Sequence, residues 1–352
     1  MAALKKETDL ETRHKELKAQ ILYRMDRFDE SLDIYKDLVK NTQDDYDTER
    51  ETNMSAVVAC VSLEGSRANL PVLGEDSYEL CYNSSIRLLG EGRTSEAETL
   101  LCKAETLCRK TLEEDGATEE EIEDELALIH VQLGYSIQLQ GRPAEAQQLY
   151  HKVLKLKPSD AALVAIAANN SAAINGAQNV FDSRRKLKMT KSELDNVDTK
   201  LTSKQRKSLA INQCLFFGLT SQVELCRKSI EQMKRDYPDG ILELVLLQAS
   251  LDSKVNRIED GLQALSRYAA SATTGEEAAL TAGLASLQIL LEKKHVDRAV
   301  ALLEQMLAKN FRLGLLGSLV SLFVARGQRD QAVSLVDQAL KRANQDKSKV
   351  QT

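Results

Sequence analysis

The chain has 352 residues with only 4 prolines, no tryptophan, 4% aromatic residues and a net charge of -6. The acidic balance argues against a protein whose main task is to wrap nucleic acid, because neutralising phosphates requires a basic face. No uncharged run reaches the roughly 18–20 residues that cross a bilayer, and the charged N-terminus lacks the apolar core of a secretory signal. The composition, rich in Leu, Ala, Glu, Lys and Gln, predicts helix nearly throughout and no sheet.

The segment Arg27–Leu38 is the first copy of a helical pattern that recurs along the chain. It aligns residue by residue with Arg142–Val153, and Ser31 and Ala146 occupy the same position. A small residue there lets two helices cross closely, so each copy predicts the second helix of a helical pair. Further copies are Gly92–Ala104 and weaker ones centred on Val223, Gly261, Ala299 and Ala332.

Residues 44–76 predict a degenerate repeat. Asp44–Leu63 has the character of a helix. The following stretch, Gly65–Asp76, contains Pro71 and Gly74, which break the chain before a partner helix can complete.

An acidic stretch follows the Gly92–Ala104 copy. Glu113–Glu125 reads EEDGATEEEIEDE and is expected to extend a second helix and then to form a solvated linker to the next repeat.

Residues 126–158 carry the most specific pattern. Gly134 lies in the first helix, Gly141 at the turn, Ala146 and Tyr150 in the second helix, and Pro158 at the exit. These offsets, within a period of ~34 residues, are typical of the tetratricopeptide repeat. The sequence therefore predicts an all-α fold, a right-handed α-solenoid of tetratricopeptide-like helical hairpins.

Residues 179–207 form the basic segment of the chain. We expect an irregular crossover packed on the solenoid, between an N-terminal array at 1–178 and a C-terminal array at 208–352. The alternative is contact with RNA, although few aromatic residues are interleaved to stack bases. The residues of that alternative are Arg184, Arg185, Lys186 and Lys188.

Motifs for chemistry are absent from the sequence. It contains no Gly-rich phosphate loop, no HExxH and no GxSxG, and its 4 histidines and 6 cysteines show no spacing typical of a metal site. We therefore predict no catalytic, metal or cofactor site and no enzyme. The cysteines suit reduced, small apolar core residues in a cytosolic protein.

Helical repeats of this kind bind polypeptides. The first helix of each pair lines the concave side of the superhelix, so its positions facing away from the second helix are available to a ligand. These positions are apolar here, which excludes the Lys, Arg and Asn of a carboxylate clamp and favours a long segment of a permanent partner. The alternative is a tightly wound superhelix in which they cover one another. The candidate groove residues are Tyr82, Ile86, Leu89, Leu128, Val131, Tyr135 and Gln138.

Several strings outside the repeat consensus resemble one family. They are Tyr23–Glu30, Asn41–Asp47, Asn53–Ala59, Glu79–Asn83 and Ala168–Asn170 leading to Gln178–Ser183. Together they are similar to the family of the 72-kDa subunit of the eukaryotic signal recognition particle, from about Leu17 to Ala339.

This resemblance implies a scaffold that holds the particle's 68-kDa subunit in its concave groove. It also implies cytoplasmic localisation with association to ribosomes and the endoplasmic reticulum, in co-translational targeting of proteins to that membrane, without membrane insertion. The chain lacks the family's first repeats and its Lys-rich, tryptophan-containing tail, so contact with the particle's RNA is expected to be indirect. The competing hypothesis is a free-standing adaptor that binds short peptides of several proteins.

Overall fold

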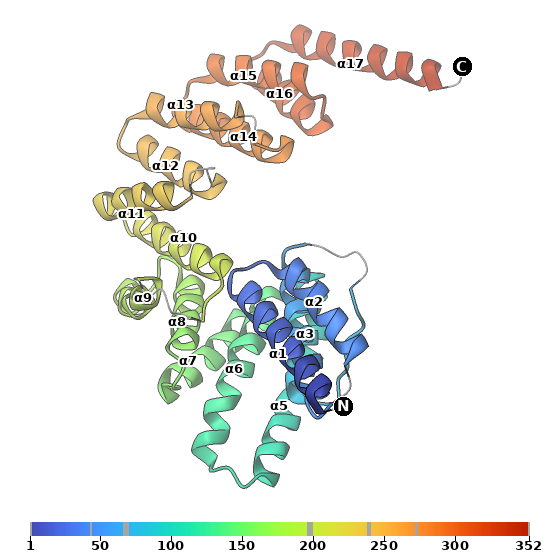
Figure 1. Cartoon of the computed structure of the whole chain (residues 1–352). Coiled ribbons are helices and arrows are strands. Elements are labelled where there is room, and N and C mark those ends of the chain that lie inside the picture. The colour runs from blue at the N-terminus through green and yellow to red at the C-terminus, as the bar shows by residue number, and fades with distance from the viewer. Residues whose placement is uncertain are drawn as a thin grey trace. The chain divides into compact units, whose positions relative to one another are not determined.

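A computed structural model describes residues 2–42, 44–65, 70–195, 200–237, 241–271 and 274–350, with side chains from residue 10 to 191 and from 200 to 341. These ranges hold 17 helices and no strand (Figure 1), which confirms the all-α prediction. The chain divides into two compact units, Met1–Phe216 (unit 1) and Phe217–Thr352 (unit 2). The helix α10 crosses this boundary.

The helices follow one another along the chain. Those of unit 1 are α1 (Ala2–Arg24), α2 (Phe28–Asn41), α3 (Asp47–Leu63), α4 (Tyr78–Gly90), α5 (Thr94–Glu114), α6 (Glu119–Leu139), α7 (Pro143–Leu156), α8 (Ala161–Asn175) and α9 (Val180–Asp195), followed by α10 (Ser203–Leu219). Those of unit 2 are α11 (Val223–Asp236), α12 (Leu242–Lys254), α13 (Ile258–Ala269), α14 (Glu276–Glu292), α15 (Val296–Lys309), α16 (Leu313–Ala325) and α17 (Arg329–Val350).

The tight turns between paired helices share one backbone geometry. Two residues before each second helix the chain adopts a left-handed conformation, and the next backbone N–H donates to the carbonyl five residues back, as from Arg142 to Ile137 at 3.2 Å. This is the bonding that ends many helices, and glycine adopts it at the lowest steric cost. The left-handed residues are Asp26, Gly92, Gly141, Ser221, Asn256, Lys294 and Gly327. Every recurring segment found in the sequence therefore begins a second helix.

The best repeat packs as predicted. A Cβ on Gly134 would lie 2.8 Å from Cε1 of Tyr150, so the absence of a side chain there admits the aromatic ring. Ala146, Tyr150 and Val153 are fully buried in the main core cluster of unit 1. The small residues and the large ring thus fill the space between α6 and α7 together.

The degenerate repeat has no second helix in its described residues. Instead α3 packs directly on α4: Ser62 Oγ donates to the carbonyl of Arg87 at 3.1 Å and Asn83 Nδ2 to Ser55 Oγ at 2.7 Å. A Cβ on Gly90 would lie 2.8 Å from the carbonyl oxygen of Ser62. Since contacting residues advance together along both helices, α3 and α4 run parallel. The extended residues 70–76 bring the chain back to the start of α4.

Most of the described part of the basic segment is helical, in α9 and the start of α10, so the expectation of an irregular segment was wrong. Helix α9 pairs with α8: Asn175 Nδ2 donates to Ser183 Oγ at 3.3 Å, and Thr190 Oγ1 to the carbonyl of Ala165 at 3.4 Å. Residue numbers rise along α9 as they fall along α8, so the two helices form an antiparallel hairpin. Burial of Ser183, Leu187 and Thr190 at helical spacing explains why α9 forms despite its charge.

The acidic stretch forms the end of α5, the turn after it and the start of α6. Thr118 caps α6 and exchanges hydrogen bonds with Glu121 in a capping box. Arg109 of α5 contacts Glu119 at 3.0 Å and Glu123 at 2.6 Å. Most of the acidic side chains are exposed, in agreement with the expected solvated segment.

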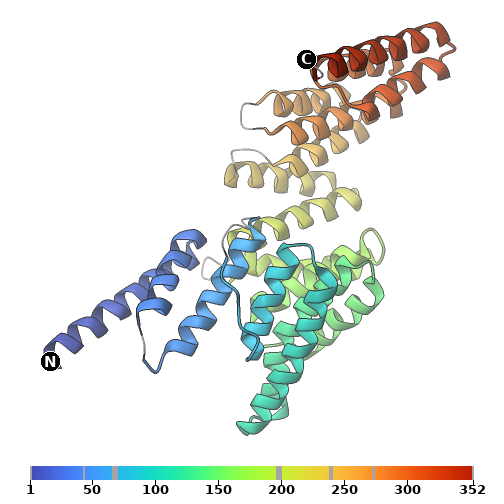
Figure 2. The same cartoon turned by 90° about the vertical axis from the view of Figure 1, so that its right-hand side faces the viewer.

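Helix α10, the last to begin in unit 1, contacts the region of its first three helices. The backbone N–H of Ser203 donates to Oδ2 of Asp26 at 3.0 Å, and Nζ of Lys204 donates to the carbonyl of Leu63 at 2.6 Å. The start of α10 therefore lies beside the α1–α2 turn and the end of α3 (Figure 2). Residues 177 positions apart in the sequence are brought into contact.

Unit 2 repeats the simpler hairpin arrangement. One core cluster joins α12, α13 and α14 around Ala249, Leu265 and Ala282, and another joins α14 to α17 around Leu303 and Leu319. Each cluster is assembled from consecutive helices, as expected for stacked repeats.

Candidate partner-binding surface

The structure separates the predicted groove residues by exposure. Leu128 and Tyr135 of α6 are 42% and 38% exposed, whereas Leu89 and Val131 are 9% and 4% exposed. Tyr82, Ile86 and Gln138 are half-buried. The accessible part of the predicted groove therefore lies on α6.

Leu89 and Val131 are less accessible than the sequence analysis expected. Val131 belongs to the main core cluster of unit 1, and Leu89 packs with Leu88 and Ala97 between α4 and α5. Because both side chains are covered by the chain itself, a ligand cannot contact them without moving helices.

Gln138 has a role within the repeat. Its Oε1 accepts a hydrogen bond from the hydroxyl of Tyr150 at 3.0 Å, and Asn170 Nδ2 donates to the same hydroxyl at 3.4 Å. Burial raises the pKa of the Tyr150 hydroxyl, which keeps it a neutral donor. This network links α6, α7 and α8 and orients the outward face of α6.

The outward face of α6 carries an apolar stripe, which we call the α6 stripe: Leu128, Tyr135 and Leu139. Leu139 is 49% exposed and lies one helical turn beyond Tyr135, so the three side chains share one face. The sequence analysis missed Leu139, although its spacing of four residues from Tyr135 would have shown it. Gln132 lies between Leu128 and Tyr135 on the same face and is half-buried.

Helix α1 carries a second exposed apolar face in unit 1. Leu10, Leu17 and Ile21 lie in α1 and Met25 in the turn directly after it. The four side chains are each between 50% and 59% exposed and recur at spacings of seven, four and four residues. Contiguous exposed apolar side chains indicate a surface for contact with protein.

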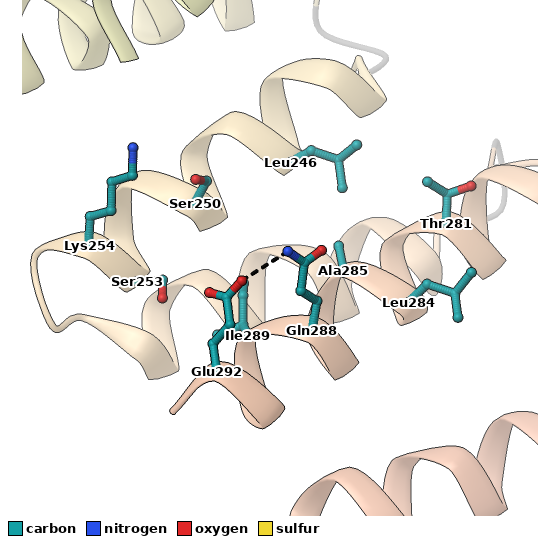
Figure 3. A pocket seen from close by; sticks show the side chains of 10 residues that line it. All are labelled: Leu246, Ser250, Ser253, Lys254, Thr281, Leu284, Ala285, Gln288, Ile289 and Glu292. Carbon is teal, nitrogen blue, oxygen red and sulfur yellow. Dashed lines mark hydrogen bonds between the residues drawn. The ribbon is translucent and has the colours of Figure 1, made fainter. Parts of the chain in front are cut away.

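Unit 2 has a groove between two of its helices. It has a volume of about 530 Å³ and lies between α12 and α14 (Figure 3). Leu246 and Leu284 give it an apolar end, and Ser250 adds a hydroxyl. The charged end holds Lys254 and Glu292, the last residues of their helices. This groove was not predicted from the sequence, because its two walls belong to helices that are not consecutive in the chain.

The basic residues of α9 that were predicted from the sequence also differ in exposure. Arg184, Arg185 and Lys188 are exposed. Lys186 is 7% exposed, and its Nζ lies 2.7 Å from Asp182 Oδ2, 2.8 Å from Ser171 Oγ and 3.1 Å from His151 Nε2. With three partners inside the chain, Lys186 is unavailable to a nucleic acid.

The cysteines lie mostly in the packed interior. Cys81, Cys108, Cys214 and Cys226 are buried, Cys60 is half-buried and Cys102 is exposed. Burial raises the pKa of Cys60, Cys108 and Cys226 to about 11, so these thiols stay protonated at neutral pH.

The described residues offer neither a metal cluster nor a membrane-spanning helix. They contain no group of three or more His, Cys, Asp or Glu side chains placed to hold a metal ion. No helix among them is long and apolar enough to span a bilayer.

The chain matches known proteins in sequence and in structure. Residues 315–350 match the tetratricopeptide repeat family. The chain is 39% identical to the signal recognition particle subunit SRP72 of Canis lupus familiaris and of Homo sapiens over 93% of its own length. It is 32% identical to that of Caenorhabditis elegans over 90%. It spans about half the length of these relatives, 48% in each case.

Among solved structures, the crystal structure of the APC/C hetero-tetramer Cut9-Hcn1 aligns with 87% of this chain and 54% of its own at a TM-score of 0.57. At 14% identity this likeness supports the solenoid fold alone. The helical hairpins, the repeat match and the sequence relatives agree. The chain, which spans about half the length of these relatives, belongs to the family of signal recognition particle subunit SRP72.

Proposed function

We propose that this chain is a non-enzymatic scaffold subunit of the signal recognition particle that holds the particle's 68-kDa subunit. The observation that carries the proposal is its 39% identity to SRP72 over 93% of the chain. In this role it supports co-translational targeting of proteins to the endoplasmic reticulum. It works in the cytoplasm, where it associates with ribosomes and the surface of that membrane.

The α6 stripe supports the proposal that the partner is a polypeptide. Leu128, Tyr135 and Leu139 hold apolar surface in water on a rigid helix whose packing is complete on its other faces. Covering such a surface contributes roughly 25 cal/mol per Å² of apolar area removed from water. An amphipathic partner segment gains this energy through anchors at helical spacing. The half-buried Tyr82 and Ile86 of α4 extend the proposed contact.

The alternative is an adaptor that binds short peptides of several proteins. Its discriminating property is affinity: an adaptor forms many transient micromolar complexes, whereas a scaffold forms one stable stoichiometric complex. The groove between α12 and α14 favours this alternative, because it combines apolar and charged ends in a volume that suits a few side chains.

The first test is a pull-down of the chain from cytosol, washed at high salt and analysed by mass spectrometry. Recovery of the 68-kDa subunit in one-to-one ratio is the expected result. Recovery of many unrelated peptides without that subunit would favour the adaptor.

Introducing negative charge into the α6 stripe tests whether it is the contact surface. Leu128→Glu together with Tyr135→Glu is expected to reduce affinity for the 68-kDa subunit at least tenfold, because burying two carboxylates without partners is costly. Leu313→Glu in unit 2, where Leu313 is 77% exposed, is the matched control. Equal affinity of both variants would reject the α6 stripe as the contact. Circular dichroism establishes that both variants fold.

A further inference from the structure

Helix α9 presents a face of uniform positive charge. Arg184, Arg185, Lys188 and Lys191 are all exposed and lie on the side of the helix opposite the buried Ser183, Leu187 and Thr190. Among the described side chains of α9, residues 180–191, the single carboxylate is Asp182, and it pairs with the buried Lys186 at 2.7 Å. No carboxylate in that range therefore neutralises the outward face.

Several exposed arginines elsewhere on the described surface are instead neutralised by glutamates. Arg27, Arg93 and Arg142 each form a short ion pair with the glutamate three residues ahead, at 2.5–2.6 Å. In unit 2, Arg298 and Arg312 also pair with glutamates. On α9, by contrast, Lys188 has like charges at positions three and four before it and three after it. Like charges at these spacings destabilise a helix, so α9 carries an internal cost that an anionic ligand would relieve.

An aromatic ring lies on the same face. Phe181, in the first turn of α9, is 90% exposed and precedes Arg184 and Arg185 by three and four residues. Its ring therefore projects beside two guanidinium groups, one helical turn away. Phe181 was not among the residues singled out from the sequence.

We infer that the outward face of α9 binds RNA, with Phe181 stacking on a base and Arg184, Arg185, Lys188 and Lys191 contacting phosphates. Stacking on aromatic rings and cationic contact with the backbone are the two components of sequence-tolerant binding to single strands. A membrane surface fits less well, because an interfacial helix needs a broad apolar face and this one offers a single large apolar ring. An acidic polypeptide would use the charges and leave the ring in water.

This site differs from the one considered from sequence alone. Lys186 is replaced by Lys191, because Lys186 is buried against Asp182, Ser171 and His151. It is also independent of the proposed partner surface on α6, so either proposal can fail without the other.

The test measures fluorescence anisotropy of a labelled single-stranded oligoribonucleotide with the full chain at 50–200 mM salt. With about four phosphate contacts, the logarithm of affinity is expected to fall with the logarithm of salt concentration at a slope of about -3, roughly 50-fold over this range. Neutralising Arg184, Arg185, Lys188 and Lys191 to Ala should reduce affinity more than tenfold and flatten the slope. Phe181→Ala should reduce affinity at least about fivefold with the slope unchanged.

The matched control neutralises four other exposed lysines, Lys18, Lys36, Lys40 and Lys155, and so changes the net charge equally. It is expected to retain the affinity of the unmodified chain. Equal losses in the two quadruple variants would overturn the site, since they would reflect net charge alone. Binding of polyglutamate or anionic vesicles that needs the α9 cations, without RNA binding, would also overturn it. Circular dichroism checks folding, and Arg185→Glu replaces the quadruple variant if that variant does not fold.

Discussion

A single buried arginine, Arg50, connects the first helices of unit 1. Arg50 of α3 is 3% exposed and contacts Glu16 of α1 at 2.6 Å, Asp44 at 2.7 Å and Asp47 at 3.1 Å. Hydrogen bonding to Arg50 holds the pKa of Asp44 below its usual range. The guanidinium fork thus connects α1, the α2–α3 loop and α3 where the repeat pattern is degenerate.

Arg50→Ala is expected to destabilise unit 1 by about 2 kcal/mol, because several charge-assisted hydrogen bonds are lost while the remaining carboxylates stay partly solvated. Urea denaturation measures the change. Arg109→Ala, which removes more accessible ion pairs with Glu119 and Glu123, is the control and should cost less than about 1 kcal/mol. Equal costs would mean that Arg50 contributes no more than a surface pair.

His151 makes unit 1 sensitive to pH. Its Nε2 lies 3.1 Å from Lys186 Nζ and 3.2 Å from Gln147 Nε2, so it accepts hydrogen bonds as a neutral ring. Partial burial and the Lys186 ammonium lower the pKa of His151 below 6.5, although Asp182 opposes this. The unfolded chain therefore binds the proton first as pH falls, and folding stability decreases below about pH 6.5.

His151→Gln is expected to remove this decrease between pH 7 and pH 5.5, above the range in which carboxylates titrate. Thermal denaturation across that range measures it. His14→Gln, at an exposed position of α1, should keep the original dependence. A pH dependence unchanged by His151→Gln would assign the effect to other groups.

At the scale of the element, the parallel pair α3 and α4 has a close approach of backbones that the α6–α7 hairpin lacks. Gly90 lies against the backbone of Ser62, whereas the hairpin glycine Gly134 lies against the side chain of Tyr150. Backbone can give way less than a ring, so the α3–α4 contact tolerates less added volume than the α6–α7 contact.

Gly90→Ala is expected to destabilise unit 1 by about 1–3 kcal/mol, because the added methyl group would lie 2.8 Å from the Ser62 carbonyl oxygen. Gly317→Ala in α16, where nothing lies within 4 Å, should instead stabilise its helix by about 0.5–1 kcal/mol. Chemical denaturation compares the two. A stabilising Gly90→Ala would show that α3 and α4 can separate freely.

At the scale of the whole molecule, stability is expected to be local within each unit. The core clusters of unit 2 are built from consecutive helices, as in quasi-one-dimensional repeat proteins. Unit 1 departs from this rule, because Ser203 and Lys204 of α10 bond to the α1–α2 turn and the end of α3.

Hydrogen exchange tests this view with the Arg50→Ala variant. Faster exchange is expected in α1 to α3 and at the start of α10, with exchange in α14 to α16 unchanged. If α14 to α16 lost protection equally, the chain would unfold as one cooperative body.

The sequence by itself determined the elements whose signals are local. Turns such as Gly92 and Gly141, small residues such as Ala146 and the break at Pro71 act within a few positions, so the hairpins and the degenerate repeat could be predicted. Only the tertiary structure decided which faces stay accessible. Val131 is covered while Tyr135 is not, Lys186 is buried while Lys188 is not, and Ser203 meets Asp26. The physical reason is that burial depends on how helices distant in the sequence pack against one another. The helical periodicity of one segment does not determine that packing.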